Sequence, residues 1–179
     1  GASQRSRARR GVGRGVRSAS HNPGGADGDF GVKVNGANGG PTPASFTDAV
    51  FECTKTLERY AIVETQTPSL DAPGKHSIGA MDVEVIDGVD DFVELMQQLF
   101  DFDRISDLIR GDFPLAFDAM HAVTGPYARR LLEGLLGAPA GSVRHGTPLE
   151  DFGGGHPDPN LTYAHELADL LLNGDGFRF

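Results

Sequence analysis

The sequence predicts an α/β fold, because short apolar segments typical of strands alternate along the chain with longer segments of helical periodicity. Glycine accounts for 25 of the 179 residues, which is typical of a chain with many tight turns and loops that approach a ligand closely. Hydrophobic residues make up 39% of the chain, enough to bury a core. Since no apolar run reaches the roughly 18 residues that cross a bilayer, we expect no membrane partner.

The first 17 residues form a basic segment. They contain six arginines of the chain's 16 basic residues and no acidic residue, and they show no hydrophobic period. We expect a disordered arm over 1–17, although a transit peptide shares this composition. The rest of the chain has ten basic residues against 25 acidic ones, which argues against a nucleic-acid surface. We therefore expect no nucleic-acid partner.

A strand and a helix are expected next. Apolar residues alternate over 30–34, which predicts a strand with Lys33 on the opposite face from the apolar side chains. A helical stripe then runs over 46–61, and Ser45 with Asp48 resembles a capping box at its start.

The second half of the chain begins after a polar linker at 65–79. A strand is expected over 83–86, followed by an Asp-Gly turn at 87–88. Glycine is expected to close two of the helices that follow. The remaining predicted elements are helices over 90–100, 104–110, 126–136 and 161–172, strands over 115–117 and 142–145, and a loop over 147–160 with Asn160 as the N-cap of the last helix.

The strongest local signal for chemistry is Ser-Ala-Ser-His-Asn-Pro-Gly-Gly at 18–25. Glycines beside Ser20 allow backbone N–H groups to face an anion, and His21 can exchange a proton with the serine or bind a phosphate. Lys33 adds a compact positive charge. Taken alone, these residue types more often form a polar turn.

The segment 150–160 allows a second interpretation as a metal site. Glu150, His156 and Asp158 are residue types that bind several divalent ions. Two prolines within the segment favour a rigid shaping loop instead, and we prefer that reading.

Several segments in one order resemble the phosphoglucomutases of the α-D-phosphohexomutase superfamily. The family pattern T-A-S-H-N-P-G-G, a short spacer and G-D-F-G-I-K is similar to 18–25 and 28–33. Further similar segments lie at 38–41, 55–61, 83–87, 118–127 and 148–164. The resemblance implies mixed-sheet α/β domains of the phosphohexomutase type, with 18–87 as the second half of domain I and 88–179 as domain II, truncated before the metal loop.

The resemblance also implies an activity. Ser20 would be the phosphoserine that exchanges a phosphoryl group between glucose 1-phosphate and glucose 6-phosphate, with glucose 1,6-bisphosphate as intermediate and activator. His21 and Lys33 would be catalytic and substrate-binding residues, and the phosphate on Ser20 would be one ligand of Mg²⁺. The expected partners are therefore small-molecule sugar phosphates. A phosphomannomutase-type phosphohexomutase and a non-catalytic phospho-accepting relative are the alternatives.

The sequence departs from the family pattern at three places. Ser18 replaces a threonine, and arginines stand in 11–17 where relatives carry an apolar strand. The third departure is that the family's metal loop, sugar-recognition loop and last domain are expected to be missing, because the resemblance places 173–178, with Asp175 as its one acid, just before the metal loop. We therefore expect this chain to lack mutase activity on its own. A single cysteine, Cys53, and no secretory signal predict a cytoplasmic protein. The sequence does not indicate an oligomeric state.

Overall fold

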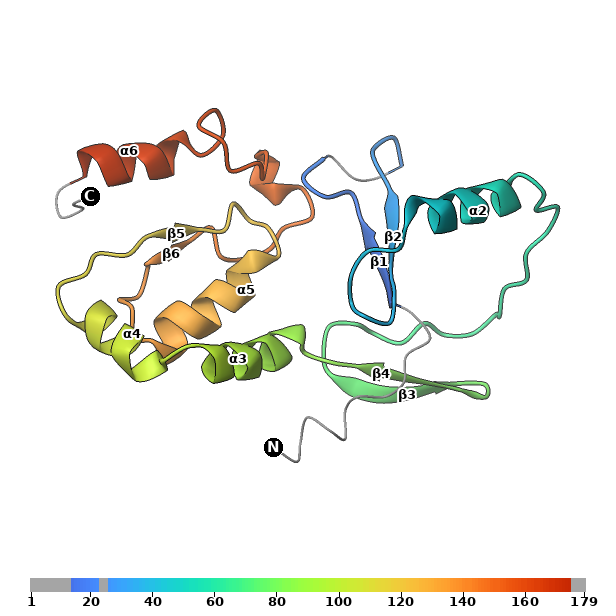
Figure 1. Cartoon of the computed structure of the whole chain (residues 1–179), viewed down its shortest axis with the longest axis horizontal. Helices are drawn as coiled ribbons and strands as arrows, with labels where there is room; N and C mark the ends of the chain where they lie inside the picture. The colour runs from blue at the N-terminus through green and yellow to red at the C-terminus, as the bar shows by residue number, and fades with distance from the viewer. Residues whose placement is uncertain (1–13, 23–25, 175–179) are drawn as a thin grey trace. The chain divides into compact units, whose positions relative to one another are not determined.

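The computed structural model describes residues 14–22 and 26–174 (Figure 1). The chain divides into two compact units between Glu64 and Thr65, and each is described by itself. The described residues form helices and three two-stranded sheets, of which two are antiparallel and one is parallel. This mixture confirms the predicted α/β class. The boundaries that the resemblance implies, at 17/18 and 87/88, stay predictions.

The first unit contains an antiparallel ribbon of β1 (Arg14–Ser18) and β2 (Gly31–Asn35). β2 confirms the predicted strand to within one residue. β1 corrects the expectation of disorder for 14–17, while residues 1–13 of that arm lie outside the described part of the chain. A strand with two arginines is tolerated here because its side chains are mostly exposed, so no charge loses its hydration.

The helix α2 spans Ala44–Thr54 and is shorter than the predicted 46–61. Its N-cap is Pro43, so the expected capping box is wrong. At its C-terminus, the N–H groups of residues 55–57 bond three residues back, and the Thr54 and Thr56 hydroxyls also donate to carbonyl oxygens three residues back. Such bonds tighten the last turn and compete with continuation of the helix.

The second unit begins with a hairpin of β3 (Gly74–Ile78) and β4 (Met81–Val85). The predicted linker over 65–79 is therefore wrong for β3. The signal that the prediction missed is Gly79, which has a φ of 59° in the two-residue connection. A glycine in that conformation is typical of tight hairpin turns.

Two capped helices follow the hairpin. The Asp87 carboxylate accepts the Val89 N–H at the start of α3 (Gly88–Leu99), and the Asp101 carboxylate accepts the Arg104 N–H at the start of α4 (Phe102–Arg110). Each cap satisfies a backbone donor that has no partner inside the helix. Both helices begin two residues earlier than predicted.

The parallel pair of β5 (Phe117–Asp118) and β6 (Val143–Arg144) lies side by side in Figure 1. Between them the chain forms α5 (Thr124–Ala128), which continues as the π-helical segment η1 (Arg129–Leu135). These two elements correspond to the predicted helix over 126–136, and α3 packs against them. The helix is closed by Gly137, with a φ of 82°, as expected.

The last elements are a 3₁₀ turn, η2 (Phe152–Gly154), and α6 (His165–Asn173). The predicted N-cap Asn160 does cap a turn, since its side-chain oxygen accepts the N–H groups of Thr162 and Tyr163. That turn is not continuous with the helix, because Ala164 leaves the helical conformation. The helix therefore begins four residues later than predicted.

The hydrophobic core of the described residues lies in the second unit. Ile109, Leu136 and Ala138 form a buried cluster in it, and Leu132 packs against them. The buried hydrophobic residues in the described ranges are Val93, Ile109, Ala119, Ala128, Leu136, Ala138 and Val143. No helix within 14–22 and 26–174 is long and apolar enough to cross a membrane.

Candidate functional site

The serine segment forms a tight turn in the first unit. The Asn22 N–H donates to the Ala19 carbonyl at 3.1 Å, which closes a four-residue turn directly after β1. Ser20 stands at its corner with a φ of 59°, a conformation that non-glycine residues rarely adopt. Its side chain is exposed. The turn therefore presents the hydroxyl to solvent at the cost of local backbone strain.

Side chains on either side of the turn hold it in place. The Ser18 hydroxyl accepts the Ser20 N–H at 2.9 Å, and Ser18 is half-buried at the end of β1. On the other side, the Asn22 amide donates to the Asp29 carboxylate at 2.7 Å. These bonds connect the turn to the residues before and after it, so its conformation is defined within the first unit.

His21 and Lys33 take different positions around Ser20. The Ser20 Oγ lies 3.3 Å from the Nδ1 of His21, within reach of a proton transfer. Lys33 is exposed and pairs with Val16 across the ribbon, two positions from the Ser18–Gly31 pair. Because side chains alternate along strands, Lys33 shares a face with Ser18, and such diagonal neighbours lie about 7–8 Å apart.

A cavity of about 360 Å³ lies in the second unit, at the carboxyl ends of β5 and β6. This end of parallel strands is where open α/β sheets bind ligands. The cavity lining consists of Asp118, Met120, His121, His145, Phe152, Gly153, Gly155, His156, Thr162, Tyr163, Ala164, His165 and Glu166. Four of these residues are histidines, which makes the cavity the second candidate site.

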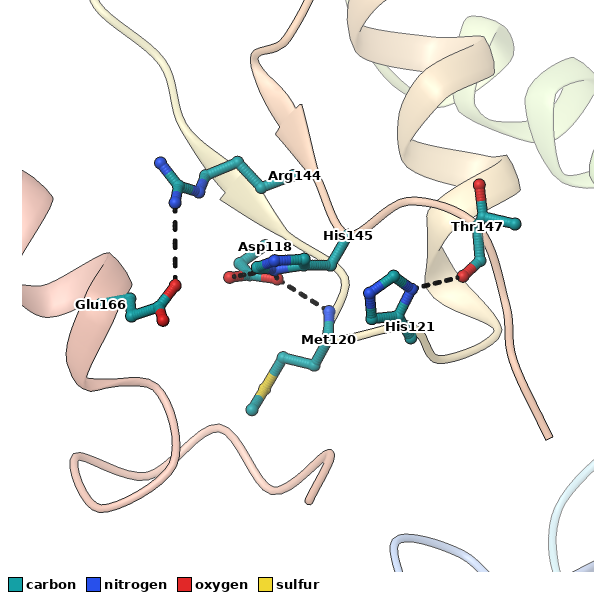
Figure 2. Close-up of polar contacts among 7 residues, drawn as sticks. All are labelled: Asp118, Met120, His121, Arg144, His145, Thr147 and Glu166. Atoms are coloured by element: carbon teal, nitrogen blue, oxygen red, sulfur yellow. Dashed lines mark hydrogen bonds and ion pairs between the residues drawn. The ribbon is translucent and has the colours of Figure 1, made fainter. Parts of the chain in front are cut away.

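The Asp118 carboxylate connects the ends of the two strands, as Figure 2 shows. It accepts the Met120 N–H at 2.8 Å and faces the Nδ1 of His145, with its two oxygens at 2.9 and 3.0 Å. Only 9% of the Asp118 side chain is exposed. Since a carboxylate only accepts hydrogen bonds, the Nδ1 of His145 carries the hydrogen.

His121 is held in a similar way. Its Nδ1 lies 2.8 Å from the Thr147 carbonyl oxygen, toward which the ring is turned in Figure 2. The His121 and His145 ring centres are 5.0 Å apart. Beside them, Arg144 faces Glu166 of α6 with 3.8 Å between Nη2 and Oε2.

Sequence reasoning did not assign chemistry to this histidine cluster. Asp118, His121 and His145 are separated by up to 27 positions, and their spacing matches no motif. The one local signal was a polar residue at the end of each short predicted strand, which marks the ligand-binding edge of a parallel sheet.

The structure favours the rigid-loop reading of 150–160. The Asp158 carboxylate accepts the Asn160 amide at 2.8 Å, and the His156 ring stacks on Tyr163 with 4.2 Å between the ring centres. No group of three or more His, Cys, Asp or Glu side chains among the described residues can hold a metal ion.

Phosphoglucomutases are similar to this chain along most of its length. A phosphoglucomutase of Rhizobium radiobacter is 51% identical over 161 residues, and phosphoglucomutase-1 of Oryctolagus cuniculus is 43% identical over 168 residues. Nine-tenths of this chain is homologous to phosphoglucomutases. A chloroplastic phosphoglucomutase 1 of Marchantia polymorpha is 47% identical over 170 residues. No protein-family model matches the chain.

The fold agrees with a solved structure of this kind. The open form of parafusin, a phosphoglucomutase from Paramecium, superposes with a TM-score of 0.83 over 90% of this chain, at 43% sequence identity. The phosphoglucomutase homologue described here covers 30% of that structure. The alignments with the three relatives include 89–94% of this chain. They include only 26–30% of the length of each relative.

Proposed function

We propose that this chain carries the phosphoryl-accepting serine of a phosphoglucomutase, with Ser20 as that serine. The observation that supports the proposal most is the position of Ser20, exposed at the corner of a strained turn that neighbouring side chains hold in place. The identity to phosphoglucomutases over nine-tenths of the chain indicates the reaction, in which glucose 1-phosphate and glucose 6-phosphate interconvert.

In the proposed step, Ser20 Oγ attacks a phosphorus atom of glucose 1,6-bisphosphate. The new bond joins Oγ to phosphorus, the bond from phosphorus to the sugar oxygen breaks, and the product is a glucose monophosphate. The hydroxyl proton passes to His21 Nδ1, 3.3 Å away, and the leaving sugar oxygen then takes up a proton. Carrying the group on serine divides the exchange into two easier transfers.

Lys33 is the proposed cation for the transferred group. Phosphoryl transfer spreads negative charge over the equatorial oxygens, so a positive side chain lowers the barrier. The ribbon register puts Lys33 on the face of Ser18, which binds the Ser20 amide, and a lysine side chain is long enough to extend along that face.

For Mg²⁺ we propose one ligand only, the phosphate that Ser20 would carry. Mg²⁺ prefers several oxygen ligands in near-octahedral geometry. Within the part of the chain that the structure describes, no three metal-binding side chains converge, so these residues do not fit a Mg²⁺ site of their own. No step of the proposed phosphoryl transfer is therefore assigned to Mg²⁺. For the compartment, the cytoplasm remains our proposal, although relatives from Marchantia and Arabidopsis are chloroplastic.

The test is phosphoryl transfer to the whole chain. We expect incubation with glucose 1,6-bisphosphate to add the mass of one phosphoryl group, which peptide mass spectrometry assigns to Ser20. Ser20→Ala should abolish the gain, whereas the matched control Ser69→Ala, at another exposed serine, should retain it. A phosphoryl group on a different residue, or no gain at all, would contradict the proposal. Faster transfer from mannose 1,6-bisphosphate would favour the phosphomannomutase alternative.

A further inference from the structure

We propose that the cavity at the carboxyl ends of β5 and β6 binds the hydroxyl groups of a neutral sugar ring, with the Nε2 atoms of His121 and His145 as acceptors. The cavity lies in the second unit, whereas the serine turn lies in the first. The proposal therefore does not depend on phosphoryl transfer to Ser20.

Backbone strain is concentrated around this cavity. Among the described residues, five that are not glycine have a positive φ: Ser20, Met120, His121, His145 and Phe152. One is the candidate nucleophile, and the other four all line the cavity. Such strained positions cluster at functional sites, because a surrounding structure maintains them only where a particular geometry is needed.

The ring nitrogens of the two histidines are arranged as acceptors. Each Nδ1 faces an oxygen that only accepts, the Thr147 carbonyl for His121 and the Asp118 carboxylate for His145, so each Nδ1 carries the hydrogen. In the neutral rings, both Nε2 atoms are then acceptors. Neither has a hydrogen-bond partner within the described residues.

The charges of the lining favour a neutral donor over an ion. No lysine or arginine is present in the described lining, while Asp118 and Glu166 both are, so an anion would meet two carboxylates and neither of these cationic side chains. Both carboxylates already have partners, Asp118 in His145 and Glu166 in Arg144. A ligand rich in hydroxyl donors satisfies this set of atoms.

The shape of the lining agrees with a ring-shaped ligand. The stacked rings of His156 and Tyr163 add a flat wall, inclined by only 9° to each other, and Phe152 adds a further apolar surface. A volume of about 360 Å³ lies within the range of small-molecule sites, which combine apolar walls with a few convergent polar groups.

The experiment is a titration of the whole chain, labelled with ¹⁵N at its histidines, with D-glucose. Long-range proton–nitrogen spectra report the tautomer of each ring and the bonding of each Nε2. We expect His121 and His145 in the form with hydrogen on Nδ1, with saturable shifts of their Nε2 signals, and no shift at the control residue His76 on β3, which does not line the cavity. Inorganic phosphate and methylammonium, titrated in parallel, should leave these signals unchanged.

Variants then test which atoms bind. His121→Asn and His145→Asn keep an amide near the position of Nδ1 and remove the acceptor at Nε2, so each should weaken glucose binding about 5- to 30-fold, as expected for one lost hydrogen bond. The matched controls His76→Asn and Ser69→Ala, at residues that do not line the cavity, should leave it unchanged. The proposal is overturned if wild-type His121 and His145 do not shift with glucose, if phosphate or methylammonium shifts them instead, or if the wrong tautomers are found. Because these outcomes are read on the wild-type chain, a variant that fails to fold does not prevent the test.

Discussion

At the scale of single residues, the two candidate sites have one feature in common. In each, a residue with strained backbone presents its side chain, and a short local hydrogen bond stabilises that backbone conformation. Ser20 at a φ of 59° is held by the Ser18 hydroxyl, and Met120, with its neighbour His121, is held through the Asp118 carboxylate. Each strained residue costs about 1–3 kcal/mol, so the supporting bonds matter for the geometry of the site.

The first prediction concerns Ser18, which we expect to position the nucleophile. Ser18→Ala removes the acceptor of the Ser20 N–H, and the loss of one hydrogen bond of about 1 kcal/mol should slow phosphorylation of Ser20 by glucose 1,6-bisphosphate about fivefold. Ser18→Thr keeps the hydroxyl and should retain the rate. Initial rates followed by mass spectrometry make the comparison. Equal rates for the alanine and threonine variants would show that Ser18 has no positioning role.

At the scale of elements, the structure depends on backbones that approach closely. The start of α5 contacts the loop after β6, where a Cβ on Gly125 would overlap the carbonyl oxygen of Gly146. Both glycines are buried. This contact brings α5 against the end of β6, next to the cavity, and leaves no room for a larger residue.

We accordingly predict that Gly125→Ala destabilises the chain by about 1–3 kcal/mol, because a backbone must move to admit the methyl group. The matched control is Gly134→Ala in η1, where an added Cβ would lie at an ordinary 3.5 Å from the Arg129 carbonyl oxygen. That variant should be neutral or stabilising by about 0.4–1 kcal/mol. Urea midpoints from circular dichroism measure both, and similar midpoints for the two variants would contradict the close approach.

Element prediction from the sequence was reliable where local chemistry decides the outcome. The closing glycine Gly137 was predicted because it acts over a few neighbouring residues. The caps Asp87 and Asp101 act over the same range but were not recognised, so α3 and α4 were predicted to begin two residues too late. Prediction was unreliable where an element had to be inferred from a weak hydrophobic pattern. α2 stops at Thr54 because hydroxyl bonds tighten its last turn, and β3 was missed because its residues show no apolar alternation.

At the scale of the whole molecule, the division into two units has a consequence for proteolysis. The segment 57–72 contains no helix or strand and is exposed along nearly all of its length, and exposed backbone of this kind is cut first. Arg59 lies within this stretch and Lys55 two residues before it, while Arg129 lies within η1.

Limited trypsin digestion tests this reading. Of the described basic residues, we expect Lys55 or Arg59 to be cleaved before Arg129, leaving a product that retains the second unit. Mass spectrometry of the early products identifies the sites. Cleavage at Arg129 first would show that η1 opens more readily than the exposed segment. The prediction that trypsin cuts near the division between the units would then be wrong.

By itself, the sequence determined the α/β class, most of the helices and a turn after Ser18. These features are local, since turn chemistry and periodicity act within a few positions. Its resemblance to phosphoglucomutases then marked Ser20, His21 and Lys33 as candidate site residues. Which residues line the cavity became known only from the tertiary structure. Asp118 meets His145 across 27 positions and His121 meets Thr147 across 26, because the parallel pairing of β5 and β6 brings their carboxyl ends together. No pattern along the chain encodes that contact, because it arises from the packing of the strands.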